Sequence, residues 1–265
     1  MVTKITRRDF LKMAGAAGVG MAALGGVLGW RGMEMSRENP KPVPKPSPYT
    51  WVRFFAGPNE TTLNPLISGL DGHLYRYRVR EVVPVIGEVP ANLMQISSAM
   101  RIETSIPPTF SEESLLSGGS SVVQFHGVRQ NLHYTSDAQR QELDKASRSE
   151  LEPSDHTTAV LIPIAKSDEW WKLAQDQRQS HFQKTDTHAG HTAIGFKYVD
   201  RVFRKLYHSR YLDGALGYDF LTYFEFDDVY AKDFRTLLTE LRNPTVNPEW
   251  VFVNHEFEIW MTKIG

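Results

Sequence analysis

Apolar and polar positions alternate most clearly in the C-terminal part of the chain. Residues 158–164 form an apolar run that predicts a buried strand, and residues 198–209 and 218–226 predict two more strands. Apolar positions at helical spacing predict a helix over residues 229–242, and alternating ones predict a closing strand over residues 250–261. The positions that carry these last two predictions are Phe234, Leu237, Leu238, Leu241, Val251, Val253, Phe257, Ile259 and Met261.

A further helix is predicted between the first two of these strands. Ser167 stands before two acidic residues as a helix N-cap, and the helix that follows carries Trp170 and Trp171. The resulting order is β-α-β-β-α-β, the ferredoxin-like arrangement, in which two helices cover one sheet face and the other face is free to pack. The pattern therefore predicts an α+β unit over residues 152–265.

The N-terminal half, residues 49–151, has a weaker pattern and shows no sequence repeat of the C-terminal half. If it is a degenerate copy of the same unit, the two sheets would pack together. Its elements are predicted from short runs: strands at residues 51–55, 74–85, 93–104 and 121–134, and a polar helix at residues 137–150.

Composition excludes several classes of protein and of site. The 265 residues are 41% hydrophobic, enough to bury the core of one large domain or two smaller ones. A net charge of -1 gives no electrostatic case for binding nucleic acid. Cysteine is absent, so disulfides, thiolate metal sites and cysteine nucleophiles are excluded. The Gly-x-Ser-x-Gly, His-Glu-x-x-His and P-loop motifs are absent too.

The N-terminus has the pattern of an export signal. Residues 6–12 read Thr-Arg-Arg-Asp-Phe-Leu-Lys, and the Gly- and Ala-rich residues 13–30 that follow carry no charge. We expect residues 1–36 to be a twin-arginine signal or a retained anchor, which places the protein in the periplasm or on the outer face of the cytoplasmic membrane. Residues 37–48 are proline-rich and predict an extended linker.

Two candidate functional side chains follow the predicted helix: His191 lies between that helix and the next strand, and Arg204 lies in that strand. His191 could ligate a metal through a neutral imidazole, although an isolated histidine is more often a capping or surface residue. His188 is its main competitor and His181 the next. Arg204 has apolar neighbours and could present its guanidinium to an anion, or it could belong to a basic strand edge with Arg201.

The order and spacing of these motifs resemble the haem-binding half of the chlorite dismutase family. Trp170-Trp171 comes first, then His191-Thr192, and then a run of Arg-Lys-Leu-Tyr-His that begins at Arg204, 13 positions after His191. The resemblance extends at motif level from residue 127 to the C-terminus. The distance from Trp171 to His191 and the stretch before Glu249 are longer than the family pattern.

The resemblance implies haem b as cofactor and a set of site residues. Each role below is what the family pattern implies: His191 as proximal iron ligand, Arg204 as distal cation, Glu249 as the carboxylate behind the histidine, Lys166 near the haem propionates, Tyr134 on the same rim, and Trp170 and Trp171 beside the macrocycle.

The resemblance also implies a fold, an activity and partners. The expected fold is α+β, of the dimeric α/β barrel type, with two ferredoxin-like βαββαβ halves at residues 49–151 and 152–265 whose antiparallel sheets pack together. The expected activity is conversion of chlorite to chloride and dioxygen by a homo-oligomer, a pentamer by family analogy, exported by the twin-arginine machinery. Alternatives are a haem peroxidase or coprohaem decarboxylase of this fold, a haem-binding or ligand-sensing protein without turnover, and a ferredoxin-like module without haem. Arg204 favours chlorite chemistry over decarboxylation.

Overall fold

The computed structural model describes residues 51–105, 121–129, 136–212 and 216–265. The predicted signal, the linker and Tyr134 lie outside these ranges. The strands are β1 (Trp51–Gly57), β2 (His73–Ile86), β3 (Ser98–Thr104), β4 (Val123–Arg129), β5 (Thr157–Lys166), β6 (Phe203–His208), β7 (Phe220–Asp227) and β8 (Val253–Lys263). The α-helices are α2 (Glu60–Ile67), α4 (Asp137–Ala146), α5 (Asp168–Lys172), α6 (Gln175–Phe182), α7 (Gly190–Phe196) and α8 (Ala231–Leu241), and the 3-10 helices are η1 (Ala91–Gln95), η2 (Asp228–Tyr230) and η3 (Pro248–Phe252).

The strands form one closed barrel in the order β1-β3-β2-β8-β5-β7-β6-β4, and neighbouring strands are antiparallel. The prediction of a mixed fold of helices and antiparallel strands is confirmed. The sheets of the two predicted halves do not stay separate, because β2 pairs with β8 and β4 pairs with β6 along both seams, which closes them into one barrel. These pairs satisfy backbone groups that would be unpaired at the edges of two open sheets.

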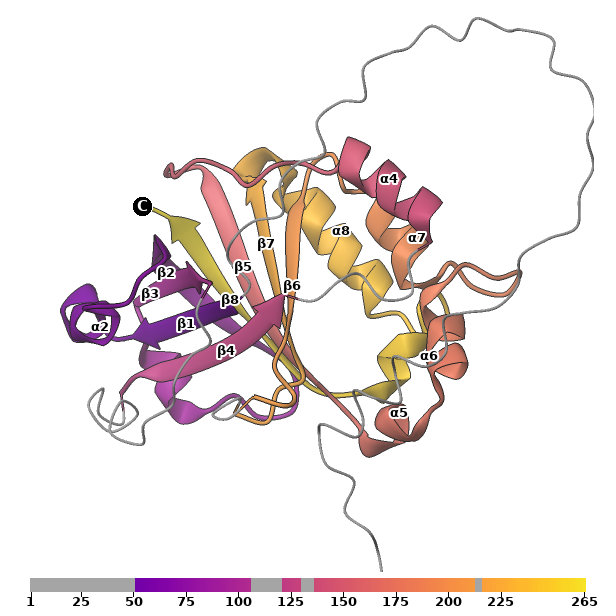
Figure 1. The fold of residues 1–265 in the computed structure, drawn as a ribbon, viewed down its shortest axis with the longest axis horizontal. Coiled ribbons are helices and arrows are strands. Elements are labelled where there is room, and N and C mark those ends of the chain that lie inside the picture. The colour runs from indigo at the N-terminus through magenta and orange to yellow at the C-terminus, as the bar shows by residue number, and fades with distance from the viewer. Residues whose placement is uncertain (1–50, 106–120, 130–135, 213–215) are drawn as a thin grey trace, which may run out of the picture. The chain divides into compact units, whose positions relative to one another are not determined.

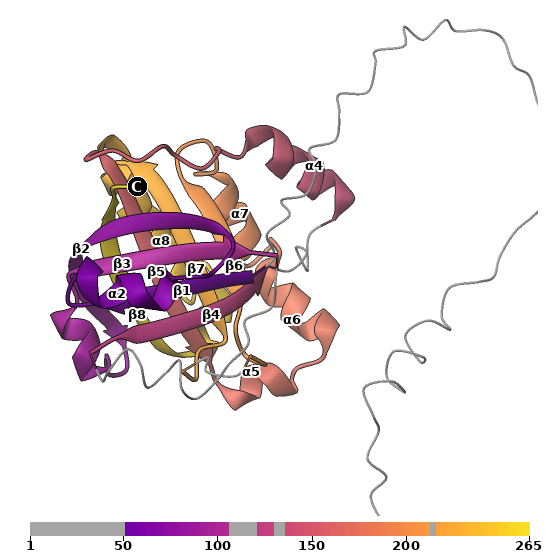
Figure 2. The same cartoon turned by 60° about the vertical axis from the view of Figure 1, so that its left-hand side comes forward.

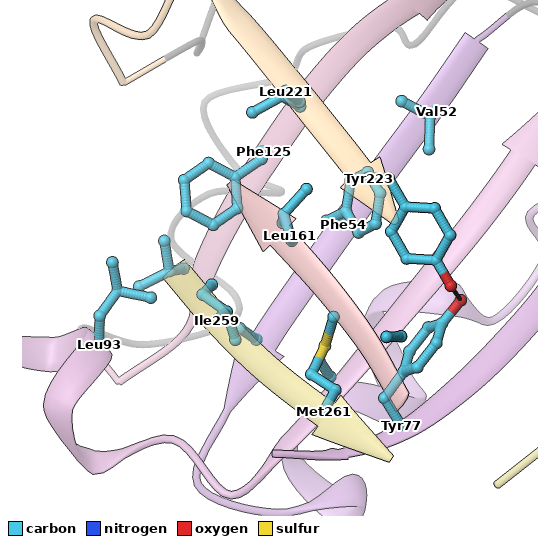
Figure 3. Packing of buried hydrophobic residues seen from close by; sticks show 14 of the residues in the cluster. Val52, Phe54, Tyr77, Leu93, Phe125, Leu161, Leu221, Tyr223, Ile259 and Met261 are labelled. Atoms are coloured by element: carbon cyan, nitrogen blue, oxygen red, sulfur yellow. Dashed lines mark hydrogen bonds between the residues drawn. The ribbon is translucent and has the colours of Figure 1, made fainter. Parts of the chain in front are cut away.

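The barrel interior is filled by every second side chain of its strands. Val52, Phe54 and Ala56 of β1 point inward, as do Leu221 and Tyr223 of β7, and all are at most 2% exposed. Figure 3 shows part of this cluster, in which side chains of β1 and β7 gather with those of β5 and β8. Because successive residues of a strand face opposite sides, the intervening residues are left for the outer face. The outer face of the C-terminal strands is the one that carries the candidate site.

Helices cover the outer face of the barrel. In Figures 1 and 2, α7 and α8 lie on the side formed by the C-terminal strands, whereas α2 lies beside the N-terminal strands. Under α8, Phe234, Leu238 and Leu241 pack on Phe224 of β7 and Ile162 of β5. These buried apolar side chains fix α8 against the strands that frame the candidate site.

Most predicted elements are found, and their boundaries shift where short helices form. The predicted helices appear as α4, α5 and α8, and Ser167 occupies the N-cap position of α5 without a side-chain cap hydrogen bond. The prediction of strand at residues 93–95 is wrong, since η1 occupies them, and η3 replaces the start of the strand predicted at 250–261. Strand β6 begins at Phe203 rather than at residue 198. The short helices α2, α6 and α7 were not predicted. Within the described ranges, no helix has the length and apolar character needed to cross a membrane.

Candidate active site

His191 lies in the first turn of α7. Gly190, just before it, adopts φ +71°, and its backbone N–H donates to the Val246 carbonyl at 2.9 Å. A Cβ at Gly190 would lie 2.5 Å from the Gln183 carbonyl oxygen and 2.6 Å from that of Phe182, so the chain can pass here only with glycine. This tight passage fixes the start of α7. The imidazole then reaches Glu249, with His191 Nδ1 3.0 Å from Glu249 Oε2.

Glu249 is held by η3, which follows α8. Pro248 stands at the start of η3, and the Asn247 side chain donates to the Leu241 carbonyl at 2.7 Å, which fastens η3 to the last turn of α8. The Glu249 side chain is 8% exposed, and both of its oxygens are used: Oε2 by His191 and Oε1 by the Lys166 ammonium. Three ionisable side chains from β5, α7 and η3 therefore form one chain of hydrogen bonds.

Lys166 is the buried end of this chain of contacts. Its side chain is 3% exposed, and Nζ lies 3.4 Å from the centroid of the Trp170 ring, a cation–π contact. The family pattern implies a place near the haem propionates for Lys166, and in the structure its ammonium pairs with Glu249 inside the protein. A buried cation needs such a partner, which explains the contact physically.

The charges of the three groups depend on one another. Burial alone would raise the pKa of Glu249, but the Lys166 ammonium and then His191 outweigh burial and hold this pKa at about 2. Burial lowers the pKa of His191, and the attraction of Glu249 offsets this only in part. A neutral imidazole whose Nδ1–H donates to Glu249 keeps the lone pair of Nε2 for a metal.

His191 and Arg204 line one pocket, with a cavity volume of about 40 Å³, between the sheet and the helices. Its walls are mainly apolar, with a few polar groups. The lining residues are Ile162, Ile164, His191, Arg204, Thr222, Phe224, Leu238, Leu241, Arg242, Trp250 and Glu256.

Arg204 projects from β6 beside its cross-strand partner Phe224. Its side chain is open to solvent and, within the described ranges, has no ion-pair partner. The surrounding protein lowers the pKa of Arg204, with Glu249 acting in the opposite direction, and a guanidinium stays charged at neutral pH. The pocket therefore contains a cation that is available to an anionic ligand. The alternative of a role only in a basic strand edge does not explain its place in the pocket wall.

The two tryptophans have different surroundings. Trp170 is 2% exposed and packs on Phe182 and Phe252 at ring-centroid distances of 5.7 and 5.3 Å, so it is a core residue. Trp171 is half-buried, stacks on Phe220 at 5.9 Å and donates from Nε1 to Asp219 Oδ2 at 3.3 Å. Neither tryptophan is among the residues that line the pocket.

The competing histidines lie elsewhere. His188 uses both ring nitrogens, Nδ1 with the Thr185 and Thr187 hydroxyls at 3.0 and 3.2 Å, and Nε2 with the Ser180 carbonyl oxygen at 3.1 Å. His181 packs on Phe252 at 5.2 Å. Neither lines the pocket that His191 lines.

Sequence reasoning missed two charged residues of this pocket, Arg242 and Glu256. Arg242 lies just after α8, and its guanidinium contacts Glu256 on β8. The alternation of β8 could have placed Glu256 on the outer face, because Glu256 is one position out of phase with Phe257, Ile259 and Met261.

The described side chains contain no cluster of three or more His, Cys, Asp or Glu arranged to hold a metal ion. A metal bound by His191 would take its remaining ligands from a cofactor or a small molecule. A porphyrin supplies four such ligands in a plane and needs only one protein imidazole.

Comparison with known proteins agrees with this geometry. Residues 70–257, more than half of the chain, match the family profile described as chlorite dismutase, and residues 4–25 match the profile of the twin-arginine translocation pathway signal sequence. The chain thus carries a signal for twin-arginine export to the periplasm, as predicted.

Individual relatives show how far the likeness extends. Chlorite dismutase of Ideonella dechloratans is 33% identical over 116 residues, which are 43% of this chain and 37% of that protein. The dimeric chlorite dismutase structure from Nitrobacter winogradskyi is 29% identical, covers 79% of this chain and 99% of its own, and gives a TM-score of 0.55. A variant chlorite dismutase from Candidatus Nitrospira defluvii in complex with cyanide shares the fold at 21% identity, with 82% and 92% coverage and a TM-score of 0.56. The chain belongs to the chlorite dismutase family.

Proposed function

We propose that this protein is a haem b enzyme that converts chlorite to chloride and dioxygen. The observation that carries the proposal is one pocket lined by both His191 and Arg204, an arginine with no ion-pair partner among the described residues. The Nδ1 atom of His191 bonds to the buried carboxylate of Glu249. Family membership supports the same activity.

The residues present fit a haem. His191 would bind the iron through Nε2, and the apolar side chains of the sheet and of α8 would lie against the macrocycle. When bound, the haem iron supplies the redox chemistry that opens Cl–O bonds and allows the two oxygens to join. The protein's task is to hold the ligand histidine, the substrate and the surrounding charges in place.

Glu249 sets the state of the ligand histidine. By accepting the hydrogen bond from Nδ1, it selects the tautomer whose Nε2 is unprotonated, and its negative charge makes the imidazole more basic. Lys166 keeps Glu249 ionised, as the low pKa of Glu249 requires. We assign Lys166 this role in place of the propionate contact that the family pattern implied.

Arg204 would hold the anion. Chlorite enters as an anion and chloride leaves as one, so the Arg204 guanidinium in the pocket lining would attract both substrate and product. The same charge would keep an oxychlorine species in the pocket until the O–O bond has formed. Arg204 is exposed, so an entering anion can reach its guanidinium directly.

The remaining predicted residues would shape the rim and support the site. Trp171 is the tryptophan able to face a macrocycle edge, whereas Trp170 supports Lys166 from the core. Tyr134 keeps its predicted rim role. We propose a homo-oligomer, for which the dimeric Nitrobacter winogradskyi structure is a precedent, and the family resemblance implies a pentamer. We also propose that the strand quartets β1–β4 and β5–β8 are the two ferredoxin-like halves, since their strand orders match.

Oxygen evolution tests the activity. Haem-loaded wild-type protein should release dioxygen and chloride from millimolar chlorite in an oxygen electrode. Arg204→Ala should retain its Soret band but lose haem absorbance several-fold faster per turnover, because the oxychlorine species escapes.

Arg201→Ala is the matched control, because Arg201 is a nearby arginine that pairs with Asp233 outside the pocket. It should behave as wild type. A haem-loaded wild type that releases no oxygen would refute the activity. Equal haem loss in Arg204→Ala and wild type would refute the role of the arginine.

A further inference from the structure

Glu256 is an acidic side chain in the lining of the pocket. This residue lies on β8, is 1% exposed and lines the same pocket as His191 and Arg204. Its cross-strand partners are Ile164 on β5 and Ile86 on β2. Neither isoleucine side chain can form a hydrogen bond, so the hydrogen bonds of the buried Glu256 carboxyl come from residues other than these two.

The hydrogen bonds of Glu256 are incomplete. Oε1 accepts from Arg242 Nε at 3.2 Å and from Arg242 Nη2 at 2.7 Å, while Oε2 has no hydrogen-bond partner among the described residues. Arg242 Nη2 is also 2.5 Å from Glu258 Oε1, and Glu258 Oε2 accepts from the Trp260 indole. The Arg242 guanidinium therefore contacts two buried carboxylates. Of their four oxygens, only Oε2 of Glu256 has no partner among the described residues, and Glu256 is the one that lines the pocket.

The surrounding charges decide which form Glu256 takes. Burial raises the pKa of Glu256 to about 7, the Arg242 guanidinium from the end of α8 opposes this, and the Glu258 charge on β8 adds to it. From other elements, the pocket is lined by His191 on α7 and Arg204 on β6, with Glu249 of η3 behind the histidine. The protonated form gives the trio of Glu256, Arg242 and Glu258 no net charge, and ionisation makes the trio negative.

We propose that Glu256 is a second ligand-binding group of this pocket, which carries a proton on Oε2 and donates it in a hydrogen bond to a bound anion. The proposal rests on the proposed function, because it concerns the same pocket. A carboxylic acid can donate only while protonated, and after ionisation its charge repels an anion. Glu256 and Arg204 would thus bind an oxyanion from two walls, the arginine at every relevant pH and the glutamic acid only below its pKa.

Anion binding to the haem-loaded full chain tests this inference. The dissociation constant of azide, read from the shift of the Soret band, is measured between about pH 5.5 and 8.5, where azide remains an anion. In wild type it should rise by up to about tenfold per pH unit above pH 7, as expected when one proton is linked to binding. Glu256→Gln should bind as tightly as wild type at low pH and lose this added dependence, since an amide N–H donates at every pH.

Glu258→Gln is the matched control. It removes a neighbouring negative charge and leaves Arg242 to Glu256 alone, so the break in the pH profile should move to lower pH. A purely structural role for Glu256 would not move it. Effects of pH that arise at the iron are common to all variants and cancel in the ratio of their dissociation constants.

Two outcomes overturn the inference. Equal pH profiles in wild type and Glu256→Gln would show that Glu256 does not bind the anion. A carbon-13 carboxyl titration of Glu256 in the wild-type apo protein with its midpoint near 4.5, the ordinary value, would show that no proton is held. This second measurement needs neither haem nor a variant. Absence of any Soret band would instead refute the proposed haem function and leave the carboxyl titration as the deciding result.

Discussion

Replacing Glu249 by glutamine should destabilise the apo protein strongly. The carboxylate is 8% exposed and is the counter-ion of Lys166, whose side chain is 3% exposed. Removing one member of a buried ion pair leaves an unpaired charge, which typically costs about 3–5 kcal/mol. The pKa of Glu249 gives a similar magnitude, because a fall from 4.5 to about 2 corresponds to roughly 3 kcal/mol of stability.

The assay is urea unfolding of the apo full chain at neutral pH, in a double-mutant cycle with Lys166→Met. Glu249→Gln alone should lower the free energy of unfolding by about 3–5 kcal/mol. Adding Lys166→Met should recover most of that loss, because the unpaired ammonium is gone and the methionine side chain still packs on Trp170. The pKa of Glu249 is depressed on folding, so its contribution is complete above pH 4.5 and is lost as the pH falls towards 2.

The difference between wild type and Glu249→Gln should therefore narrow in acid. A loss below about 1 kcal/mol, or a Lys166→Met change that adds to the loss rather than relieving it, would refute the reasoning. The first result would mean that the Glu249–Lys166 pair behaves like an exposed one.

Three further predictions concern single sites. Gly190→Ala should lower the free energy of unfolding by more than about 1 kcal/mol and weaken haem binding, because the added Cβ would lie too close to two carbonyl oxygens. Gly195→Ala, in the same helix, is the control, since a Cβ there has open space. This variant should unfold and bind haem in a Soret titration as well as wild type does. Trp170→Ala should lower the free energy of unfolding by about 3–5 kcal/mol, measured with heat or urea, because it leaves a cavity in the core. Trp171→Ala should lower it clearly less, since Trp171 is half-buried, and the reverse order would contradict this packing. His181→Ala should retain the wild-type Soret band, because His181 does not line the pocket, and loss of haem in this variant would count against that placement.

The parts of the fold that follow a simple period could be predicted from the sequence. The stripe of Phe234, Leu237, Leu238 and Leu241 predicts α8, and the alternation of Phe257, Ile259 and Met261 predicts β8. The strand pairs at the two seams, β2 with β8 and β4 with β6, could not be predicted, because they depend on backbone pairing between strands far apart in the chain.

Some residues of the candidate site could be predicted from the spacing of motifs along the chain. His191, Arg204 and Glu249 come from three elements, and only the family pattern related them before the structure did. The partner of Lys166 was not predictable, since an ion pair between residues 83 positions apart leaves no local pattern. Helix α7 was missed because its seven residues contain two glycines and are too short for an apolar stripe.

The central claim is that His191 binds haem iron in this pocket, and a haem titration tests it most directly. Wild type and His188→Ala should give the same Soret band at one haem per chain. His191→Ala should not give it, and added imidazole should restore it by entering the space left by the missing side chain. A His191→Ala protein that binds haem with the wild-type spectrum and affinity, without imidazole, would contradict the account.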